Sequence, residues 1–218
     1  MSRGKQARFA KNTEAKNLLE PGKEGFDTIK GNWKKDFFKN DKPITLEMGC
    51  GRGEYTVGLG RIFSDRNFIG IDIKGSRICN GSQIALNEGI DNVGFLRTHI
   101  LFLSDLFENN EVDEIWVTFP DPRPKDRDIR KRLISPRYLD LYRSVLKKGG
   151  IVHLKTDNKD LYDYSLELVK EQGLNVLANT DDLYASHLLD DHHGLQTTYE
   201  KRYISEGFKI NYLKFELS

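Results

Sequence analysis

A glycine-rich turn follows an apolar segment early in the chain. The segment 44–48 runs into glycines at three alternate positions, Gly49, Gly51 and Gly53. Such glycines let the backbone bend sharply and approach a ligand closely, beside the positive N-terminal end of a helix. A dinucleotide fingerprint needs its third glycine at position 54, which is occupied by Glu54. The turn is therefore a ligand site that fits a pyrophosphate poorly.

Two carboxylates accompany this turn. Glu47 lies two residues before Gly49, where it would repel a phosphate and attract a cation. Asp72 ends the next predicted strand, nineteen residues after Gly53, and a carboxylate there can accept both ribose hydroxyls of an adenosine cofactor. S-adenosylmethionine carries an ammonium and a sulfonium group but no phosphate, so the pattern predicts this cofactor. The alternative is a tight turn with solvated acids.

A stiff, basic loop holds the second candidate site. Asp121 stands among three prolines at alternate positions, which fix φ and stiffen the loop. The sequence therefore predicts a preorganised carboxylate beside the cofactor, at the carboxyl edge of the sheet. Arginine and lysine side chains suit phosphate groups, and six follow Asp121: Arg123, Lys125, Arg127, Arg130, Lys131 and Arg132. The alternative is a solvated basic turn.

Two further clusters are predicted near this edge. Lys155, Thr156 and Asp157 end a later strand, and the tetrapeptide 197–200 precedes the last one. Glu200 could accept from N1 and the 2-amino group of guanine, a pair worth about 1–3 kcal/mol of discrimination. The alternative for Glu200 is a surface ion pair with a neighbouring Lys201 or Arg202.

Strands alternate with helices along most of the chain. Because helices of 10–15 residues separate short apolar strands, the pattern predicts an α/β fold with a parallel sheet. The predicted strands are Ile44–Met48, Asn67–Ile71, Asn92–Leu96, Glu114–Phe119, Ile151–Lys155, Leu174–Ala178 and Gly207–Phe215. The predicted helices are Glu54–Phe63, Gly75–Asn87, Ser135–Leu146 and Lys159–Gln172. Residues 1–43 are predicted to form a basic N-terminal arm, and residues 44–218 the domain.

Charge is segregated along the chain although its net value is +1. Residues 1–39 hold ten basic and five acidic side chains, and residues 122–148 hold ten basic and three acidic. Between residues 98 and 121 there are six acids and no lysine or arginine. This pattern favours a polyanion partner on one face, with solvated charged faces as the alternative.

Other classes of protein are disfavoured. No apolar run reaches the length of a membrane span, and the basic N-terminus lacks the apolar stretch of a secretory signal. The two cysteines, Cys50 and Cys79, are too few for a disulfide framework or a cysteine metal site. The histidines at 187, 192 and 193 lack metal-ligand spacing. We expect a cytoplasmic protein without a metal, as a monomer or homodimer.

Taken in order, these motifs resemble the bacterial tRNA (guanine-N7-)-methyltransferases. The turn at 47–53, the loop Phe-Pro-Asp-Pro-Arg-Pro-Lys-Asp-Arg-Asp-Ile-Arg-Lys-Arg-Leu at 119–133, the Lys-Thr-Asp at 155–157 and the stretch 197–203 carry the resemblance. It implies a class I methyltransferase (Rossmann-like), doubly wound fold of seven strands, the last antiparallel. It implies methylation of guanine N7 in a tRNA variable loop, with S-adenosyl-L-methionine as methyl donor and tRNA as partner.

The resemblance also implies roles for individual residues. Asp121 would be catalytic, and the cofactor contacts would be Glu47, Gly49, Gly51, Gly53, Asp72, His99 and Asp121. The guanosine would be held by Lys125, Asp157, Thr197, Thr198, Tyr199 and Glu200. The RNA would lie against Arg127, Asp128, Ile129, Arg130, Lys131 and Arg132. The chain departs from the family pattern at three positions: His99 replaces Asp or Asn, Arg123 replaces Trp, and Asp128 replaces His.

Three other functions remain open on the residues alone. An Asp-Pro-x-Pro loop is loosely similar to loops that hold an exocyclic amine, so a methyltransferase for such an amine is one alternative. An RNA-binding protein with a vestigial cofactor pocket is another, which the intact glycines, Glu47 and Asp72 disfavour. A nicotinamide dehydrogenase is disfavoured by Glu47 and Glu54.

Overall fold

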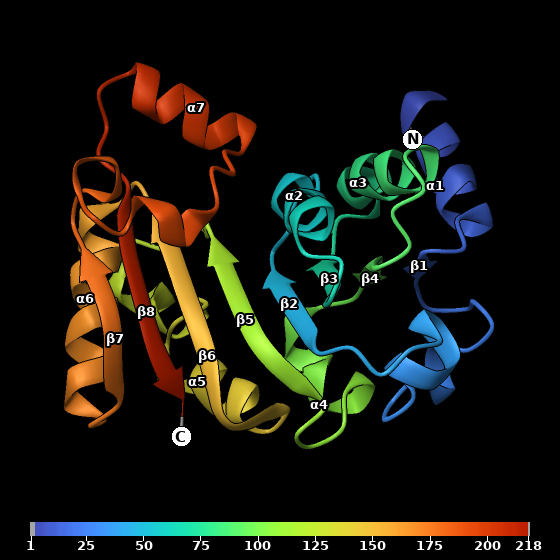
Figure 1. Ribbon diagram of the computed structural model, residues 1–218, viewed down its shortest axis with the longest axis horizontal. Helices are drawn as coiled ribbons and strands as arrows, with labels where there is room; N and C mark the ends of the chain where they lie inside the picture. The colour runs from blue at the N-terminus through green and yellow to red at the C-terminus, as the bar shows by residue number, and fades with distance from the viewer. Residues whose placement is uncertain (1–2, 218) are drawn as a thin grey trace.

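The computed structural model describes residues 3–217, without the side chain of Arg3. Its centre is one mixed sheet of eight strands in the order β1-β4-β3-β2-β5-β6-β8-β7, with helices on both faces (Figure 1). The strands are β1 (Leu18–Leu19), β2 (Ile44–Met48), β3 (Asn67–Asp72), β4 (Val93–Arg97), β5 (Val112–Thr118), β6 (Leu146–Thr156), β7 (Asn175–Thr180) and β8 (Asn211–Leu217). The α-helices are α1 (Arg3–Glu14), α2 (Glu54–Ile62), α3 (Gly75–Asn87), α4 (Leu103–Leu106), α5 (Pro136–Arg143), α6 (Lys159–Glu171) and α7 (Thr198–Ser205).

The predicted α/β class is confirmed, and so is the antiparallel last strand. β8 runs antiparallel to both β6 and β7, whereas the other strand pairs of the sheet are parallel. The strand order reverses between β2 and β5. In open α/β sheets, ligands bind at the carboxyl ends of the strands beside such a switch point. The topology therefore places a ligand crevice next to the ends of β2 and β5.

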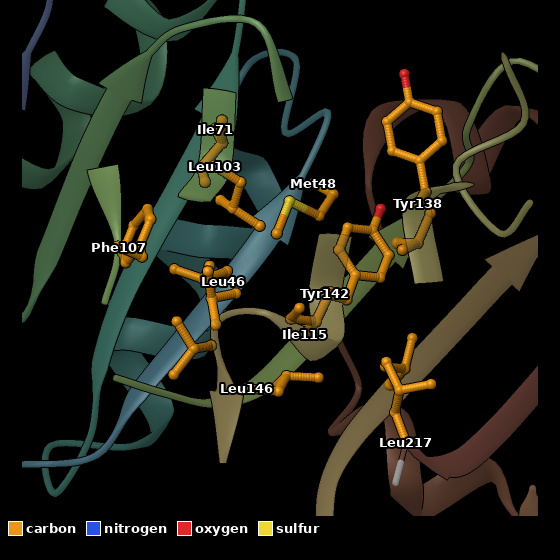
Figure 2. Close-up of a cluster of buried hydrophobic side chains, with 14 of the residues drawn as sticks. Leu46, Met48, Ile71, Leu103, Phe107, Ile115, Tyr138, Tyr142, Leu146 and Leu217 are labelled. Carbon is orange, nitrogen blue, oxygen red and sulfur yellow. The ribbon is translucent and has the colours of Figure 1, made fainter. Parts of the chain in front are cut away.

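The central strands are buried on both faces because helices cover both sides of the sheet. Every residue of β2 is buried, whereas the edge strand β7 alternates between exposed and half-buried positions. One apolar cluster joins Leu46 and Met48 of β2 to Ile115 of β5 and Tyr142 of α5 (Figure 2). This packing makes β2 and β5 a rigid base for the loops that follow them.

The N-terminal segment contributes to the sheet and the core. β1 pairs with β4 and adds an eighth strand to the seven that the sequence predicts. Trp33 is fully buried, its Nε1 donates to the Leu106 carbonyl at 2.8 Å, and its ring stacks on Phe107 at 5.0 Å. α1 lies along α3, where Asn12 donates to the Gly75 carbonyl at 2.8 Å (Figure 1). The segment 18–38 thus packs with the domain, although the sequence predicts an arm over 1–43.

The helix α7 is absent from the sequence prediction. It precedes β8, which begins at Asn211 rather than at the predicted Gly207. The signal was present: Thr197-x-x-Glu200 is a capping box, in which Thr197 accepts from the Glu200 amide and Glu200 from the Thr197 amide. None of the helices in the described part of the chain is long and apolar enough to cross a membrane.

Candidate active site

A cavity of about 680 Å³ opens at the carboxyl ends of β2 and β5, at the strand switch point. It gathers segments that lie far apart in the sequence: the glycine turn, the proline loop, the end of β6 and the start of α7. The predicted site residues that line it are Glu47, Gly49, Gly51, Asp121, Asp157, Thr197, Thr198 and Tyr199. The structure therefore brings most of the predicted cofactor and guanosine residues to one place.

The glycine turn adopts a backbone that favours glycine. Gly49, Gly51 and Gly53 have φ angles of 76°, 56° and 72°, which L side chains rarely adopt. A Cβ on Gly53 would lie 2.5 Å from the Phe95 ring, so this glycine also permits close packing. A Cβ on Gly51 would meet no atom closer than the Gly49 carbonyl at 4.0 Å. The turn therefore leaves room for a ligand directly above its backbone.

Asp72 fixes this turn from the end of β3. Its Oδ2 accepts from the Gly51 amide at 3.0 Å, and its Oδ1 accepts from the Lys74 amide at 2.8 Å. Asp72 and Gly53 are absent from the residues that line the cavity. In the structure the carboxylate thus supports the glycine turn directly.

Glu47 is buried beneath the cavity floor. Its Oε1 accepts from the Thr118 hydroxyl at 2.5 Å, while its Oε2 accepts from the Thr56 amide at 2.9 Å and from the Thr56 hydroxyl. Burial raises the pKa of Glu47 to about 7, and the threonine hydrogen bonds partly oppose that rise. A cation bound in the cavity would favour the ionised carboxylate. The Glu47 carboxylate therefore fits a cofactor that carries positive charge.

His99 stands apart from the cavity lining. It follows β4 as an exposed side chain, and its Nδ1 accepts from the Leu101 amide at 3.2 Å. Because Nδ1 acts as the acceptor of that bond, the neutral ring presents Nε2 as an N–H donor. The resemblance implies a cofactor contact at His99, where the family has Asp or Asn, and in this rotamer the remaining ring nitrogen is a donor.

The proline loop holds Asp121 in a strained backbone. Phe119 and Arg123 both have a φ of 47°, in the left-handed region that side chains other than glycine rarely enter. The Asp121 Oδ1 accepts from the Arg123 amide at 3.3 Å, and its Oδ2 lies 3.2 Å from the Arg123 Nε. The Asp121 side chain is 61% exposed and lines the cavity. Such strain concentrates at functional sites, where the surrounding structure maintains it.

Arg132, which is predicted to contact RNA, packs inside the protein in the structure. It is buried, its guanidinium donates to the carbonyls of Pro122 and Arg123 at 3.1–3.4 Å, and it lies 4.4 Å from the Tyr164 ring centroid. Through these hydrogen bonds, Arg132 therefore stabilises the backbone conformation of the proline loop. Its neighbours are on the surface: Arg127 and Lys131 are 78% and 61% exposed, and Arg130 and Lys125 are exposed as well.

Asp128 reduces the local positive charge of this loop. Its Oδ1 lies 2.6 Å from the Lys131 Nζ, and its Oδ2 lies 4.0 Å from the Arg127 Nε. Ile129 is half-buried. The exposed cations of the loop adjoin the cavity without lining it.

Glu200, in the first turn of α7, is buried and does not line the cavity. Its Oε1 lies 2.8 Å from the Lys155 Nζ, with both side chains fully buried, and it accepts from the Tyr184 hydroxyl at 3.0 Å. The Lys155 Nζ also lies 5.0 Å from the Tyr55 ring centroid. Burial lowers the pKa of Lys155, and the Glu200 carboxylate opposes that shift. The ion-pair partner of Glu200 is thus Lys155 rather than the neighbouring Lys201 or Arg202.

A second carboxylate fixes the start of α7. The Glu54 Oε2 accepts from the Thr198 amide at 2.6 Å, and its Oε1 accepts from the Thr198 hydroxyl at 2.5 Å. These bonds tie the first turn of α2 to the first turn of α7 across the cavity edge. Asp157 lines the same cavity, and burial raises the pKa of its carboxyl group.

The sequence analysis missed several residues of this site. Glu54 was interpreted only as a mismatch to the dinucleotide pattern, and its tie to Thr198 spans 144 positions. The missed lining residues include five cations or aromatic side chains: Arg52, Lys74, Arg77, Arg202 and Tyr203. Arg52 lies within the glycine turn, and Arg202 and Tyr203 lie within the stretch 197–203 that carries the resemblance, so the sequence offered a signal for these three.

Comparisons with known proteins agree with this geometry. A family model described as a putative methyltransferase matches residues 41–213. The solved structure of the 16S rRNA methyltransferase KamB superposes with a TM-score of 0.61 at 17% identity, covering 81% of this chain and 88% of that chain. A SAM-dependent methyltransferase from Aquifex aeolicus superposes with a TM-score of 0.56 at 12% identity, covering 98% of both. These two likenesses show the class I methyltransferase fold.

Closer relatives are found among curated proteins. The tRNA (guanine-N(7)-)-methyltransferase of Cytophaga hutchinsonii is 47% identical over 99% of this chain and 98% of its own length. Its counterpart from Bacteroides fragilis is 45% identical over 100% of this chain and 87% of its own length. Identity at this level over nearly the whole length shows that the chain belongs to the tRNA (guanine-N(7)-)-methyltransferase family, whose methyl donor is S-adenosylmethionine.

Proposed function

We propose that the protein methylates N7 of a guanosine in tRNA, with S-adenosylmethionine as the methyl donor. One observation carries the proposal: a buried carboxylate with a raised pKa, Glu47, and a rigidly held one, Asp121, share a cavity beside exposed arginines and lysines. The relatives named above, which carry this activity in their names, support the same reading.

The reaction needs no base to remove a proton from the ring. Guanine N7 has a lone pair and no proton, so it can displace a methyl group directly. S-adenosylmethionine supplies that methyl group on a sulfonium. The contribution of this chain is to hold the guanine in line, and proximity of this kind provides about 7–11 kcal/mol.

Asp121 stabilises the positive charge of the reacting groups. Positive charge moves onto the guanine ring during methyl transfer, and a fixed carboxylate beside the ring stabilises it. The strained backbone at Phe119 and Arg123 and the guanidinium of Arg132 keep the loop in place. Asp121 is therefore the catalytic residue of the proposed mechanism.

The guanosine is held by residues at the other side of the cavity. Asp157, Thr198 and Tyr199 line it, and we assign them to guanosine binding. The ion pair between Glu200 and Lys155, and the bonds of Glu54 to Thr198, fix α7 over the site. We infer that Glu200 acts through α7, as a positioning residue.

The exposed cations of the proline loop bind the tRNA backbone. Arg127, Arg130 and Lys131 are on the surface next to the cavity, where their charges can meet phosphates. We place the reaction in the cytoplasm and on the variable loop of tRNA, as the family resemblance implies.

Incubation of unmodified tRNA with the protein and labelled S-adenosylmethionine tests the proposal, with the product digested to nucleosides. Label in 7-methylguanosine is the expected result. Label on an exocyclic amine would support the alternative methyltransferase, and tRNA binding without any transfer would support an RNA-binding protein with a vestigial pocket.

A further inference from the structure

Three aromatic side chains form a ladder along α7 and past its end. The rings of Tyr199 and Tyr203 are stacked, with centroids 6.4 Å apart, and Tyr203 meets Phe208 edge to face at 5.5 Å. Tyr199 is 58% exposed and Phe208 is 52% exposed. Large aromatic side chains gathered on a surface mark interaction sites more often than single exposed ones do. The ladder (Tyr199, Tyr203 and Phe208) therefore needs a partner.

Helix capping explains the position of Phe208 but not its exposed ring. Gly207, with a φ of 83°, ends α7: its amide donates to the Ile204 carbonyl at 3.0 Å, and the Phe208 amide donates to the Tyr203 carbonyl at 2.9 Å. This is a Schellman motif, which usually brings an apolar side chain at position 208 against residue 203. An aliphatic side chain would satisfy that contact as well.

The ladder leads from the cavity to the outer surface. Tyr199 and Tyr203 line the cavity together with Asp121, whereas Phe208 is absent from its lining. α7 lies beyond the ends of β5 and β6, at the edge of the sheet where the cavity opens (Figure 1). A chain that enters the cavity from outside would therefore pass along these rings.

Cations accompany the rings. Lys201 and Arg202 are exposed on α7, and Lys209, next to Phe208, has a side chain that is 68% exposed. Arg202 pairs with Glu206 at 2.7 Å and Lys209 with Asp182 at 3.3 Å, so these three cations outnumber the two carboxylates that pair with them. Aromatic faces beside cations are the combination with which proteins bind unstacked nucleotides. The charge of this surface thus favours RNA over an apolar protein partner.

Entry of a guanine into the cavity explains why a base-stacking surface lies beside it. A guanine that enters the cavity must leave its base stack, and the next base then loses a stacking neighbour. We propose that Tyr203 and Phe208 replace that neighbour, so that the nucleotide adjacent to the methylated guanosine stacks on the outer part of the ladder. The proposal rests on the function proposed above and extends it to a second nucleotide.

Binding of unmodified tRNA to the full-length protein tests this assignment without any methyl transfer. Dissociation constants are measured over a range of salt concentrations for the wild type and for Phe208→Ala, Phe208→Leu and Phe208→Trp. Because stacking is not electrostatic, Phe208→Ala and Phe208→Leu should weaken binding by about 5- to 150-fold while the salt dependence stays the same. Phe208→Trp should bind at least as tightly as the wild type.

The leucine and tryptophan variants separate stacking from helix capping. Both keep an apolar contact with Tyr203, so both should melt near the wild-type temperature even if the alanine variant does not fold. Wild-type affinity in Phe208→Leu would overturn the proposal and leave Phe208 a capping residue. Equal affinity in all four proteins would also overturn it and would point to a protein partner for the ladder.

A crosslinking measurement locates the stacked base. tRNA transcribed with 5-iodouridine is irradiated on the protein, because this base crosslinks to aromatic rings stacked against it. A crosslink from the peptide that contains Phe208 to a nucleotide beside the methylated guanosine is expected, and crosslinks only elsewhere would contradict the assignment. If the nucleoside analysis finds no 7-methylguanosine, the proposed function fails, whereas the binding results still decide whether the ladder contacts RNA.

Discussion

Lys155 and Glu200 form an ion pair of 2.8 Å in which both side chains are fully buried. Lys155 is the penultimate residue of β6 and Glu200 lies in the first turn of α7, so the pair ties the sheet edge to the helix over the cavity. The remaining oxygen of Glu200 accepts from the Thr197 amide at 3.4 Å. This contact relates the Lys-Thr-Asp cluster to the Thr-x-x-Glu cluster, which the sequence analysis treats as two separate parts of a guanosine site.

Removal of one partner should be more harmful than removal of both. Lys155→Met leaves a buried carboxylate without its cation, which should lower the free energy of unfolding by about 3–5 kcal/mol. The double variant Lys155→Met with Glu200→Gln keeps the capping geometry without charge and should recover much of that loss. Urea unfolding of the three proteins measures both effects. Equal losses in the single and double variants would show that the pair itself matters little.

Because of Glu47, the folded protein should be less stable at neutral pH than at about pH 4.5. Its pKa is about 7 in the folded protein, against 4.5 for an ordinary glutamate, so the folded state binds more protons between these values. Its stabilising contribution is therefore complete below about pH 4.5 and is lost as the pH rises to about 7. Relative to the wild type, Glu47→Gln should gain about 3 kcal/mol in free energy of unfolding between pH 4.5 and pH 8. Urea unfolding across that range measures the gain, and a constant difference would contradict it.

The same carboxylate should make cofactor affinity depend on pH. A cationic ligand favours ionised Glu47, so affinity for S-adenosylmethionine should rise with pH up to about 7 and level off above it, with about tenfold weaker binding at pH 6 than at pH 8. Glu47→Gln should bind weakly at both values. The measurement is the dissociation constant at each pH, and a pH-independent wild type would separate Glu47 from cofactor binding.

Asp121→Asn should reduce turnover more than tRNA affinity. The amide keeps the size of the side chain but removes its charge, so kcat should fall about 100-fold while the tRNA dissociation constant changes little. Asp128→Asn is the matched control, because it makes the same change in the same loop at a residue that pairs with Lys131. Wild-type turnover in Asp121→Asn would remove Asp121 from the catalytic role.

Neighbouring arginines of the proline loop should behave differently. Arg127→Ala removes an exposed cation, so the slope of log affinity for tRNA against log salt should become shallower by about 0.7–0.9 with little change in melting temperature. Arg132→Ala removes the donor to the Pro122 and Arg123 carbonyls, so it should lower the melting temperature and kcat instead. Similar behaviour of the two variants would contradict their separate assignments.

The sequence predicts those parts of the site whose structure depends on residues close together in the chain. The glycine turn depends on three positive φ angles, and the proline loop depends on residues close together in sequence, so both were found from the sequence. The roles of Arg132 and Glu200 depend on partners that only the fold brings near, Tyr164 and Lys155. Residue type and spacing alone do not distinguish Arg132 or Glu200 from the exposed charged residues beside them in the sequence.

The secondary-structure elements differ in the same way: those with a local sequence pattern were predictable, and one that depends on tertiary pairing was not. The strands from β2 to β8 were predictable from their apolar runs, although β6 begins at Leu146 and contains the glycines 149 and 150 that precede the predicted strand. β1 has only two residues and owes its existence to pairing with β4, so no periodic pattern could reveal it. α7 is short, but its capping box was visible in the sequence.

Calorimetric titration of the folded protein with S-adenosylmethionine at pH 8 tests the central claim most directly. The claim is that the cavity at the switch point of the sheet binds a cationic methyl donor beside the buried carboxylate of Glu47. The predicted result is heat of binding at one site per chain, lost in Glu47→Gln. A protein that unfolds cooperatively on heating yet gives no heat of binding with this donor would contradict the account.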